Sequence, residues 1–113
     1  MKLVALAAAI AALTASSALG ATPTLNGTVG PGFTITLKKG TAKVTKLKAG
    51  SYVIKVSDKS NIHNFRLKGP GVNKSTSVGG MGTSTWKVTL KKGKYTFVCD
   101  PHATIMKGSF TVS

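Results

Sequence analysis

The chain has 113 residues, and its 16 lysine and arginine residues against 2 acidic ones give a formal net charge of +14. The length predicts one small domain, and so basic a surface attracts acidic partners and anionic membranes or polymers in a salt-dependent way. Because Asp58 and Asp100 are the only acidic residues, the sequence offers no pair of catalytic carboxylates, and no Ser-His-Asp order suggests itself.

The first twenty residues have the pattern of a secretory signal peptide. Lys2 supplies a positive n-region, residues 3–13 form an apolar h-region, and the small residues Ala18 and Gly20 offer a cleavage site. We expect residues 1–20 to be removed and residues 21–113 to form one domain, exported to the periplasm or outside the cell. The segment is short for a transmembrane helix, and an uncleaved N-terminal anchor is the alternative.

Residues 21–113 show alternating apolar residues between glycine-containing turns, a pattern typical of strands. We expect strands around residues 33–37, 52–56, 65–67, 86–90, 95–99 and 110–112, and no segment has a helical period with caps. Residues 72–85 have the weakest period and are expected to form a loop with some irregular strand. The spacing predicts an all-β sandwich of about seven to eight strands.

Cysteine occurs once, at Cys99, so no internal disulfide can form. A leftover thiol in an oxidising compartment is a liability unless it is buried, paired with another chain or bound to something. Cys99 ends a strand, Pro101 interrupts the ladder, and His102 and Met106 follow before the next strand. The only other histidine, His63, starts a separate strand, and the four side chains converge if the two strands are neighbours.

This set of donors points to copper. Thiolate and thioether are soft and favour Cu(I), whereas imidazole suits both oxidation states. Two histidines, one cysteine and a weak axial methionine make a trigonal site intermediate between the preferences of Cu(II) and Cu(I), as fast one-electron transfer requires. Zn(II) could occupy the same ligands, although structural zinc sites more often use more cysteines and no methionine.

The run CDPHATIMKGSFTV at 99–112, with HNF at 63–65 and LKAGSY at 47–52 upstream, resembles the cupredoxins, blue-copper proteins such as plastocyanin, pseudoazurin and amicyanin. The resemblance covers essentially all of residues 24–113 and implies a Greek-key β-sandwich. Three residues separate His102 from Met106, where plastocyanin-like loops have four and amicyanin-like loops two, so the subfamily and the redox potential stay open.

Carried over by motif, the resemblance implies one copper ion bound by His63, Cys99, His102 and, as the weak axial ligand, Met106. Asn64 would tie the two ligand loops together and hydrogen-bond near the sulfur. Electrons would pass through a partly exposed His102, with Pro101, Ala103 and Ile105 as an apolar docking patch. The acidic face of plant plastocyanins is absent, so a photosynthetic partner is not implied.

Plainer interpretations of these residues stay open. Cys99 could be a buried structural thiol and Met106 a core gap-filler. Met81, between two glycines, is a rival axial ligand, although we expect an exposed apolar tip near the site. We expect Asp100 to shape its loop and Trp86 to belong to the core.

The expected function is a soluble, monomeric one-electron carrier that exchanges electrons with an acidic redox partner such as a cytochrome or an oxidase. It is expected not to be an enzyme, because all four ligands come from the protein and leave no open metal position. Copper storage or delivery with the same ligands is one alternative. The other is a basic secreted module for anionic polymers, with weak polyanion or membrane-surface contact and no specific nucleic acid. Lysine without the bidentate fork of arginine, and scarce stacking aromatics, weaken this last alternative.

Overall fold

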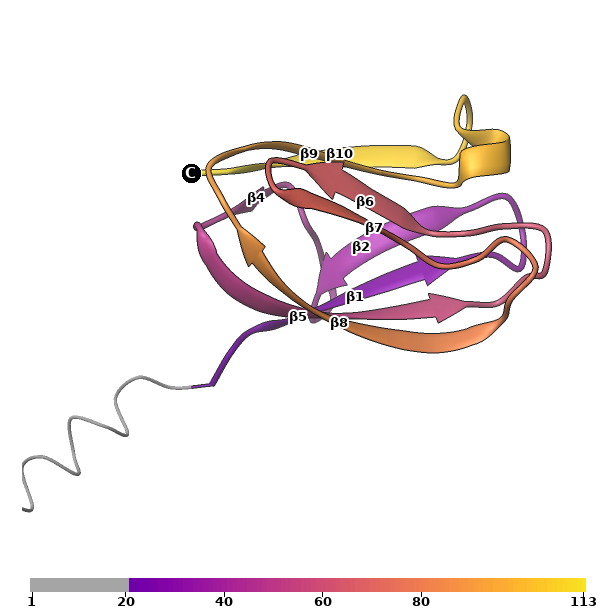
Figure 1. Ribbon diagram of the computed structural model, residues 1–113, viewed down its shortest axis with the longest axis horizontal. Helices are drawn as coiled ribbons and strands as arrows, with labels where there is room; N and C mark the ends of the chain where they lie inside the picture. The colour runs from indigo at the N-terminus through magenta and orange to yellow at the C-terminus, as the bar shows by residue number, and fades with distance from the viewer. Residues whose placement is uncertain (1–20) are drawn as a thin grey trace, which may run out of the picture.

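The computed structural model describes residues 21–113, so the expected signal peptide at 1–20 lies outside the described residues. Two five-stranded sheets face each other, which confirms the all-β sandwich (Figure 1). One sheet has the order β3-β2-β1-β5-β8 and the other β4-β10-β9-β6-β7. The strands are β1 (Thr24–Val29), β2 (Ile35–Lys39), β3 (Ala42–Lys43), β4 (Lys46–Leu47), β5 (Gly50–Asp58), β6 (Arg66–Gly69), β7 (Val72–Ser75), β8 (Gly82–Leu90), β9 (Gly93–Val98) and β10 (Lys107–Val112).

The number of strands agrees with the expectation once their lengths are considered. Within residues 21–113, eight strands have four residues or more, whereas β3 and β4 have two each. β3 is the edge of one sheet and β4 the edge of the other, so residues 42–47 pass from sheet to sheet along one side. Between Val98 and β10 lies the short 3-10 helix η1 (Asp100–His102). No helix among the described residues is long and apolar enough to cross a membrane.

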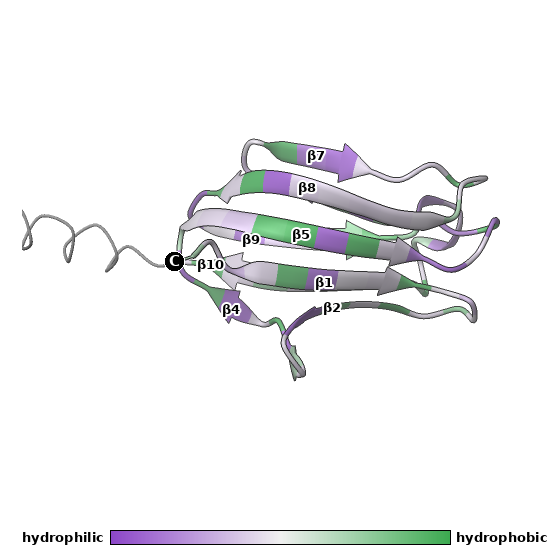
Figure 2. Ribbon diagram, turned by 90° about the horizontal axis from the view of Figure 1, so that it is seen from below, coloured by the Kyte–Doolittle hydropathy of each residue, from purple (hydrophilic) through white to green (hydrophobic). Residues whose placement is uncertain are grey.

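The core follows from the alternation seen in the sequence. Along β5, Tyr52, Ile54 and Val56 are buried while Lys55 between them is exposed. Hydrophobic and hydrophilic residues alternate in the same way along the strands in Figure 2. Side chains of one strand point to alternate faces, so every second residue of each sheet enters the space between the sheets. Burial of each large apolar side chain contributes about 1.5–3 kcal/mol.

Buried aromatic rings stack in pairs against the sheet that contains β9. Phe65 stacks on Phe97 with ring centroids 5.8 Å apart, and Tyr95 stacks on Phe110 at 5.3 Å. The Phe97 ring occupies the space where a β-carbon of Gly108 would lie. This packing therefore requires glycine at position 108, two residues after Met106.

One expectation about strand boundaries was wrong, and a second was partly confirmed. Phe33 was placed in a strand, but β2 begins at Ile35, and Phe33 lies in a loop with 55% of its surface exposed. The preceding Gly30-Pro31-Gly32 explains the late start, because glycine and proline favour turns over strand pairing. Residues 72–85 hold more strand than expected, since they contain β7 and the start of β8, with a loop only at 76–81.

Strand register gathers four loops at one end of the sandwich. In one sheet Asp58, the last residue of β5, pairs with the end of β1 and the start of β8. In the other, Val98 at the end of β9 pairs with the first residues of β6 and β10. We call this the loop end; its loops are 30–34, 59–65, 76–81 and 99–106. The C-terminus lies at the opposite end, which we call the turn end (Figure 1).

Candidate metal centre

Cys99 is fully buried at the point where β9 leaves the sheet. Its N–H donates to the carbonyl of Met106 at 3.0 Å, and its carbonyl accepts the N–H of His102 at 3.0 Å. The N–H of Met106 donates to the carbonyl of His102 at 2.8 Å. Pro101 fits the first turn of η1, where a missing N–H costs nothing. The loop that holds three of the four candidate ligands is therefore a closed, hydrogen-bonded turn.

His63 reaches the same place from the β5–β6 loop. A local turn shapes this loop: Asp58 Oδ1 accepts the N–H of Ser60 at 3.1 Å, and Ser60 Oγ accepts the N–H of Ile62 at 3.2 Å. Short polar side chains that hydrogen-bond their own backbone two residues on are typical of such turns. The imidazole of His63 is fully buried, whereas that of His102 is half-buried.

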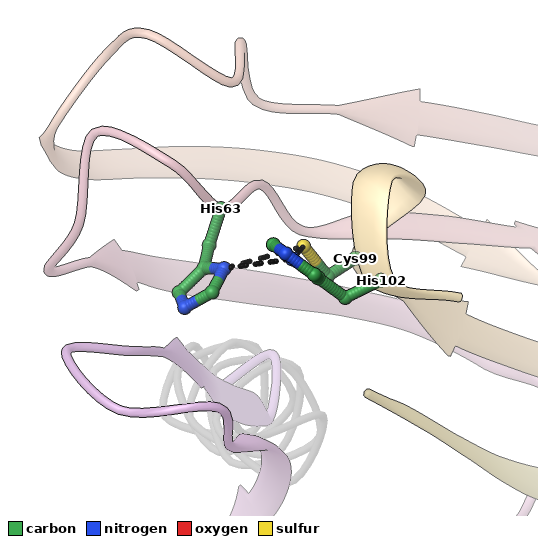
Figure 3. Close-up of side chains that lie close together, drawn as sticks. All are labelled: His63, Cys99 and His102. Atoms are coloured by element: carbon green, nitrogen blue, oxygen red, sulfur yellow. Dashed lines mark hydrogen bonds between the residues drawn. The ribbon is translucent and has the colours of Figure 1, made fainter. Parts of the chain in front are cut away.

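His63, Cys99 and His102 point their donor atoms at one another (Figure 3). The two Nδ1 atoms lie 3.1 Å apart, and Cys99 Sγ lies 3.7 Å from Nδ1 of His63 and 3.5 Å from that of His102. A metal ion bound to two nitrogens and one sulfur in a plane would space these donors about 3.5–3.8 Å apart. The two sulfur–nitrogen spacings fit this range, and the nitrogen–nitrogen spacing is about 0.4 Å shorter than it. The donor set suits a first-row metal ion, and copper suits this mixture best.

The two methionines named by the sequence differ in their surroundings. Met106 is buried and belongs to the same closed loop as Cys99 and His102. Met81 lies in the 76–81 loop and is 65% exposed, as expected for an apolar tip. Met106 is therefore buried in the loop of Cys99 and His102, whereas Met81 is exposed in a different loop.

Asn64 links the two ligand loops. Its backbone N–H points at Cys99 Sγ at 3.4 Å, a direction that stabilises a thiolate. Its side-chain Oδ1 accepts the N–H of Asp100 at 2.7 Å, and its Nδ2 donates to Asp100 Oδ2 at 2.8 Å and to the carbonyl of Thr76 at 3.3 Å. One buried amide thus holds three loops together around the sulfur.

Asp100 has a partner that the sequence did not reveal. Arg66, the only arginine in the chain, donates through Nε to Asp100 Oδ1 at 2.9 Å. The hydrogen bond from Arg66, joined by that from Asn64, holds the pKa of Asp100 below its ordinary value against the opposing effect of burial. The same bond to Asp100 raises the pKa of Arg66. The carboxylate of Asp100, next to Cys99 in the chain, is therefore charged, and the guanidinium of Arg66 balances its charge.

Phe33 is a second feature that sequence reasoning missed. Its ring meets the ring of His63 edge-on with centroids 5.0 Å apart, and that of His102 at 4.8 Å. The strand alternation of residues 33–37 concealed this, although the Gly-Pro-Gly run before Phe33 signals a loop.

Comparisons with known proteins agree with this arrangement. A family model described as a cupredoxin-like domain matches residues 3–112. Among proteins with curated descriptions, none matches the sequence. A reduced rusticyanin is similar in structure with a TM-score of 0.62 and 21% identity, covering 83% of this chain and 81% of its own. A rusticyanin described as a copper protein gives 0.61 and 20%, covering 83% and 79%. The rusticyanin of Thiobacillus ferrooxidans gives 0.58 and 21%, covering 83% and 79%. At these identities the likeness shows the fold.

Proposed function

Because this chain belongs to the cupredoxin-like domain family, we propose that it is an exported blue-copper protein that carries single electrons between redox partners. One copper ion would be held by His63, Cys99 and His102, with Met106 as the weak axial ligand. The observation that carries the proposal is the convergence of one sulfur and two imidazole nitrogens within 4.8 Å at the loop end. Residues 1–20 would be the signal peptide and residues 21–113 the mature domain.

Bound copper would supply a one-electron couple between Cu(II) and Cu(I). The contribution of the chain is to hold the donors still. Asn64 ties Cys99 to two neighbouring loops, and the closed 99–106 turn fixes His102 against Cys99. Side chains locked by hydrogen bonds and packing change little when the charge of a bound ion changes. A small rearrangement favours fast electron transfer, and no bond-making step on a substrate is needed.

The surroundings of His102 suggest where a partner docks. The four loops of the loop end expose five large apolar side chains: Phe33, Ile62, Val78, Met81 and Ile105. We call these five residues the apolar rim. Apolar groups at the centre of an interface, with charge kept away, are typical of protein contacts. Half-buried His102 would be the exit for electrons, and the basic remainder of the molecule would attract an acidic cytochrome or oxidase from a distance.

The proposal is tested on protein recovered after export of the full chain. Its mass reports whether residues 1–20 have been removed. One equivalent of Cu(II) is added, and visible absorption and EPR spectra are recorded before and after reduction with ascorbate and reoxidation. We expect a strong thiolate-to-copper band with narrow hyperfine coupling that disappears and returns. A colourless protein, or a band that cannot be cycled, would overturn the carrier function.

A matched pair of variants tests the axial ligand. Met106→Leu keeps the apolar volume and removes the thioether, so the reduction potential and EPR spectrum should change. Met81→Leu makes the same change at the exposed methionine and should leave both as in the wild type. An effect of Met81→Leu alone would exchange the roles of the two residues.

A further inference from the structure

His63 lacks the anchor that usually orients a histidine ligand. A metal-bound histidine almost always donates its other ring N–H to a carboxylate, a carbonyl or a water, which fixes the ring. The ring of His63 turns Nδ1 toward Cys99 and His102 (Figure 3), while its Nε2 is buried without a hydrogen-bond partner among the described residues. On the Nε2 side, packing must therefore supply the constraint on the orientation of this imidazole.

The β1–β2 loop supplies that packing. Phe33 presents its ring to both imidazoles, at interplanar angles of 73° to His63 and 81° to His102. Edge-to-face contacts of this kind prefer a defined geometry. At Gly30, a β-carbon would lie 3.3 Å from Cδ2 of His63 and 2.9 Å from Cβ of Ser60, so the backbone of the same loop closes on the ring.

The loop is itself held in place. The N–H of Gly30 donates to the carbonyl of Thr34 at 2.9 Å, which closes the loop at its base. The N–H of Lys59 donates to the carbonyl of Val29 at 2.9 Å, which ties it to the loop of His63. Gly30 has φ +74°, a conformation that favours glycine. Phe33 therefore projects from a fixed support although more than half of its surface is exposed.

We propose that Phe33 is a positioning residue of the metal centre. Its ring holds the imidazoles of His63 and His102 so that both Nδ1 atoms face Cys99 Sγ, and it covers them from solvent. This role replaces the missing hydrogen bond at His63 Nε2. The inference rests on the proposed copper function. It gives the 30–34 loop, which contains none of the proposed ligands, a role in the metal centre.

The test compares Phe33→Ala and Phe33→Tyr with the control Val53→Ala, which shortens a half-buried apolar side chain of β5 outside the four loops of the loop end. Each protein is loaded with copper and reduced, and the rate of Cu(I) loss to an excess chelator is measured beside the thiolate-to-copper band of the oxidised form. Thermal unfolding of the metal-free proteins gives the stability of the fold separately.

Phe33→Ala should lose copper about tenfold faster, because two ring contacts together amount to about one decade in an equilibrium constant. Its charge-transfer band should shift, while Phe33→Tyr and Val53→Ala behave as the wild type. If Phe33→Ala does not fold, Phe33→Leu, which keeps the bulk and loses the ring, takes its place with the same expected result.

Two other results are distinguishable. If the wild type binds copper and Phe33→Ala keeps its release rate and band, or Phe33→Tyr is as impaired as Phe33→Ala, the role of the Phe33 ring is overturned and the copper function stands. If the wild type takes up no copper, the proposed function itself fails, and this inference fails with it.

Discussion

The two ends of the sandwich differ in charge and in how their side chains are held. The loop end carries the donors and the apolar rim, Lys59 is the only lysine of its four loops, and both acidic residues are hydrogen-bonded. At the turn end, Lys39, Lys46 and Lys48 surround one hollow beside Pro23. The lysines therefore lie mostly away from the loop end, where the exposed large side chains are apolar.

Among residues 21–113 the one ion pair is that of Arg66 with Asp100, so the lysines add no ion pair to the fold. Lys38 and Lys43 are direct cross-strand neighbours in β2 and β3, and both are exposed. Like charges in this arrangement are destabilising. The two acidic residues of the chain, Asp58 and Asp100, both lie at the loop end. We therefore interpret the loop end as built for a defined site and the remaining surface as built for charge.

The largest expected effect is the loss of copper binding when the sulfur atom of Cys99 is removed. Cys99→Ala removes the sulfur that both imidazoles face, so the thiolate-to-copper band should vanish completely while the metal-free protein keeps its β-sheet circular dichroism. Titration with Cu(II) followed by absorption is the measurement. A variant that remained blue would show that the donors at the loop end are not the metal site.

Copper should stabilise the fold through the loop end. A ligand present at a thousand times its dissociation constant adds about 4 kcal/mol to the free energy of unfolding if it binds only the folded state. For a domain of this size the melting temperature should rise by roughly 4–8 °C for each kcal/mol. Calorimetry with and without Cu(II) measures the rise, and Cys99→Ala is the control that should show little of it. An equal rise in both proteins would place the binding elsewhere.

Replacing isoleucine by alanine in the core and in the apolar rim should change the free energy of unfolding by very different amounts. Ile54 in β5 is fully buried, whereas Ile105 in the ligand loop is 66% exposed. Ile54→Ala should lower the free energy of unfolding by about 2–5 kcal/mol, while Ile105→Ala should change it by about 0.5 kcal/mol or less. Urea unfolding of the metal-free variants gives both values. Comparable losses would mean that the loop end contributes to stability as the core does.

Much of the fold follows from the sequence because its causes are local. Alternation along residues 52–56, 86–90 and 95–99 reports which side chains enter the core, and that alternation survives folding. The ligand loop is similarly local: Cys99, His102 and Met106 are close in sequence and share one hydrogen-bonded turn. The approach of His63 could be inferred only from a resemblance, since it depends on which strands become neighbours.

The partners of the site could not be predicted because they depend on register between distant strands. Arg66 meets Asp100 because β6 and β9 pair so that Arg66 lies opposite Val98. Phe33 meets the histidines because β1 ends beside β5. Nothing in the sequence near Phe33 distinguishes a strand residue pointing inward from a loop residue leaning on a ring, apart from the Gly-Pro-Gly run.

A smaller effect is expected when the basic surface is altered. Lys38→Gln, Lys39→Gln and Lys43→Gln together remove three charges from the β2–β3 edge without touching the loop end. Elution from a heparin column should move to lower salt, because polyanion binding by surface lysines is electrostatic. The free energy of unfolding should change by about 0.5 kcal/mol or less for each site, and toward greater stability, since like charges are removed. The copper band should not move; a shift would show that the edge and the site are coupled.

The smallest expected effect concerns the ion pair at the loop end. Arg66 and Asp100 are both partly exposed, so the pair contributes only about 0.5 kcal/mol. Because the folded protein lowers the pKa of Asp100, this contribution is fully present above the pKa of the unfolded chain and is lost as the pH falls below about 4. Arg66→Gln should therefore destabilise the metal-free protein slightly at pH 7 and make its stability less sensitive to acid. Urea unfolding between pH 7 and pH 3 gives the pH dependence of the free energy of unfolding for the wild type and for Arg66→Gln. If the two proteins lose stability in parallel, the carboxylate beside Cys99 is held by Asn64 alone, and the loop end owes its order to hydrogen bonds without help from charge.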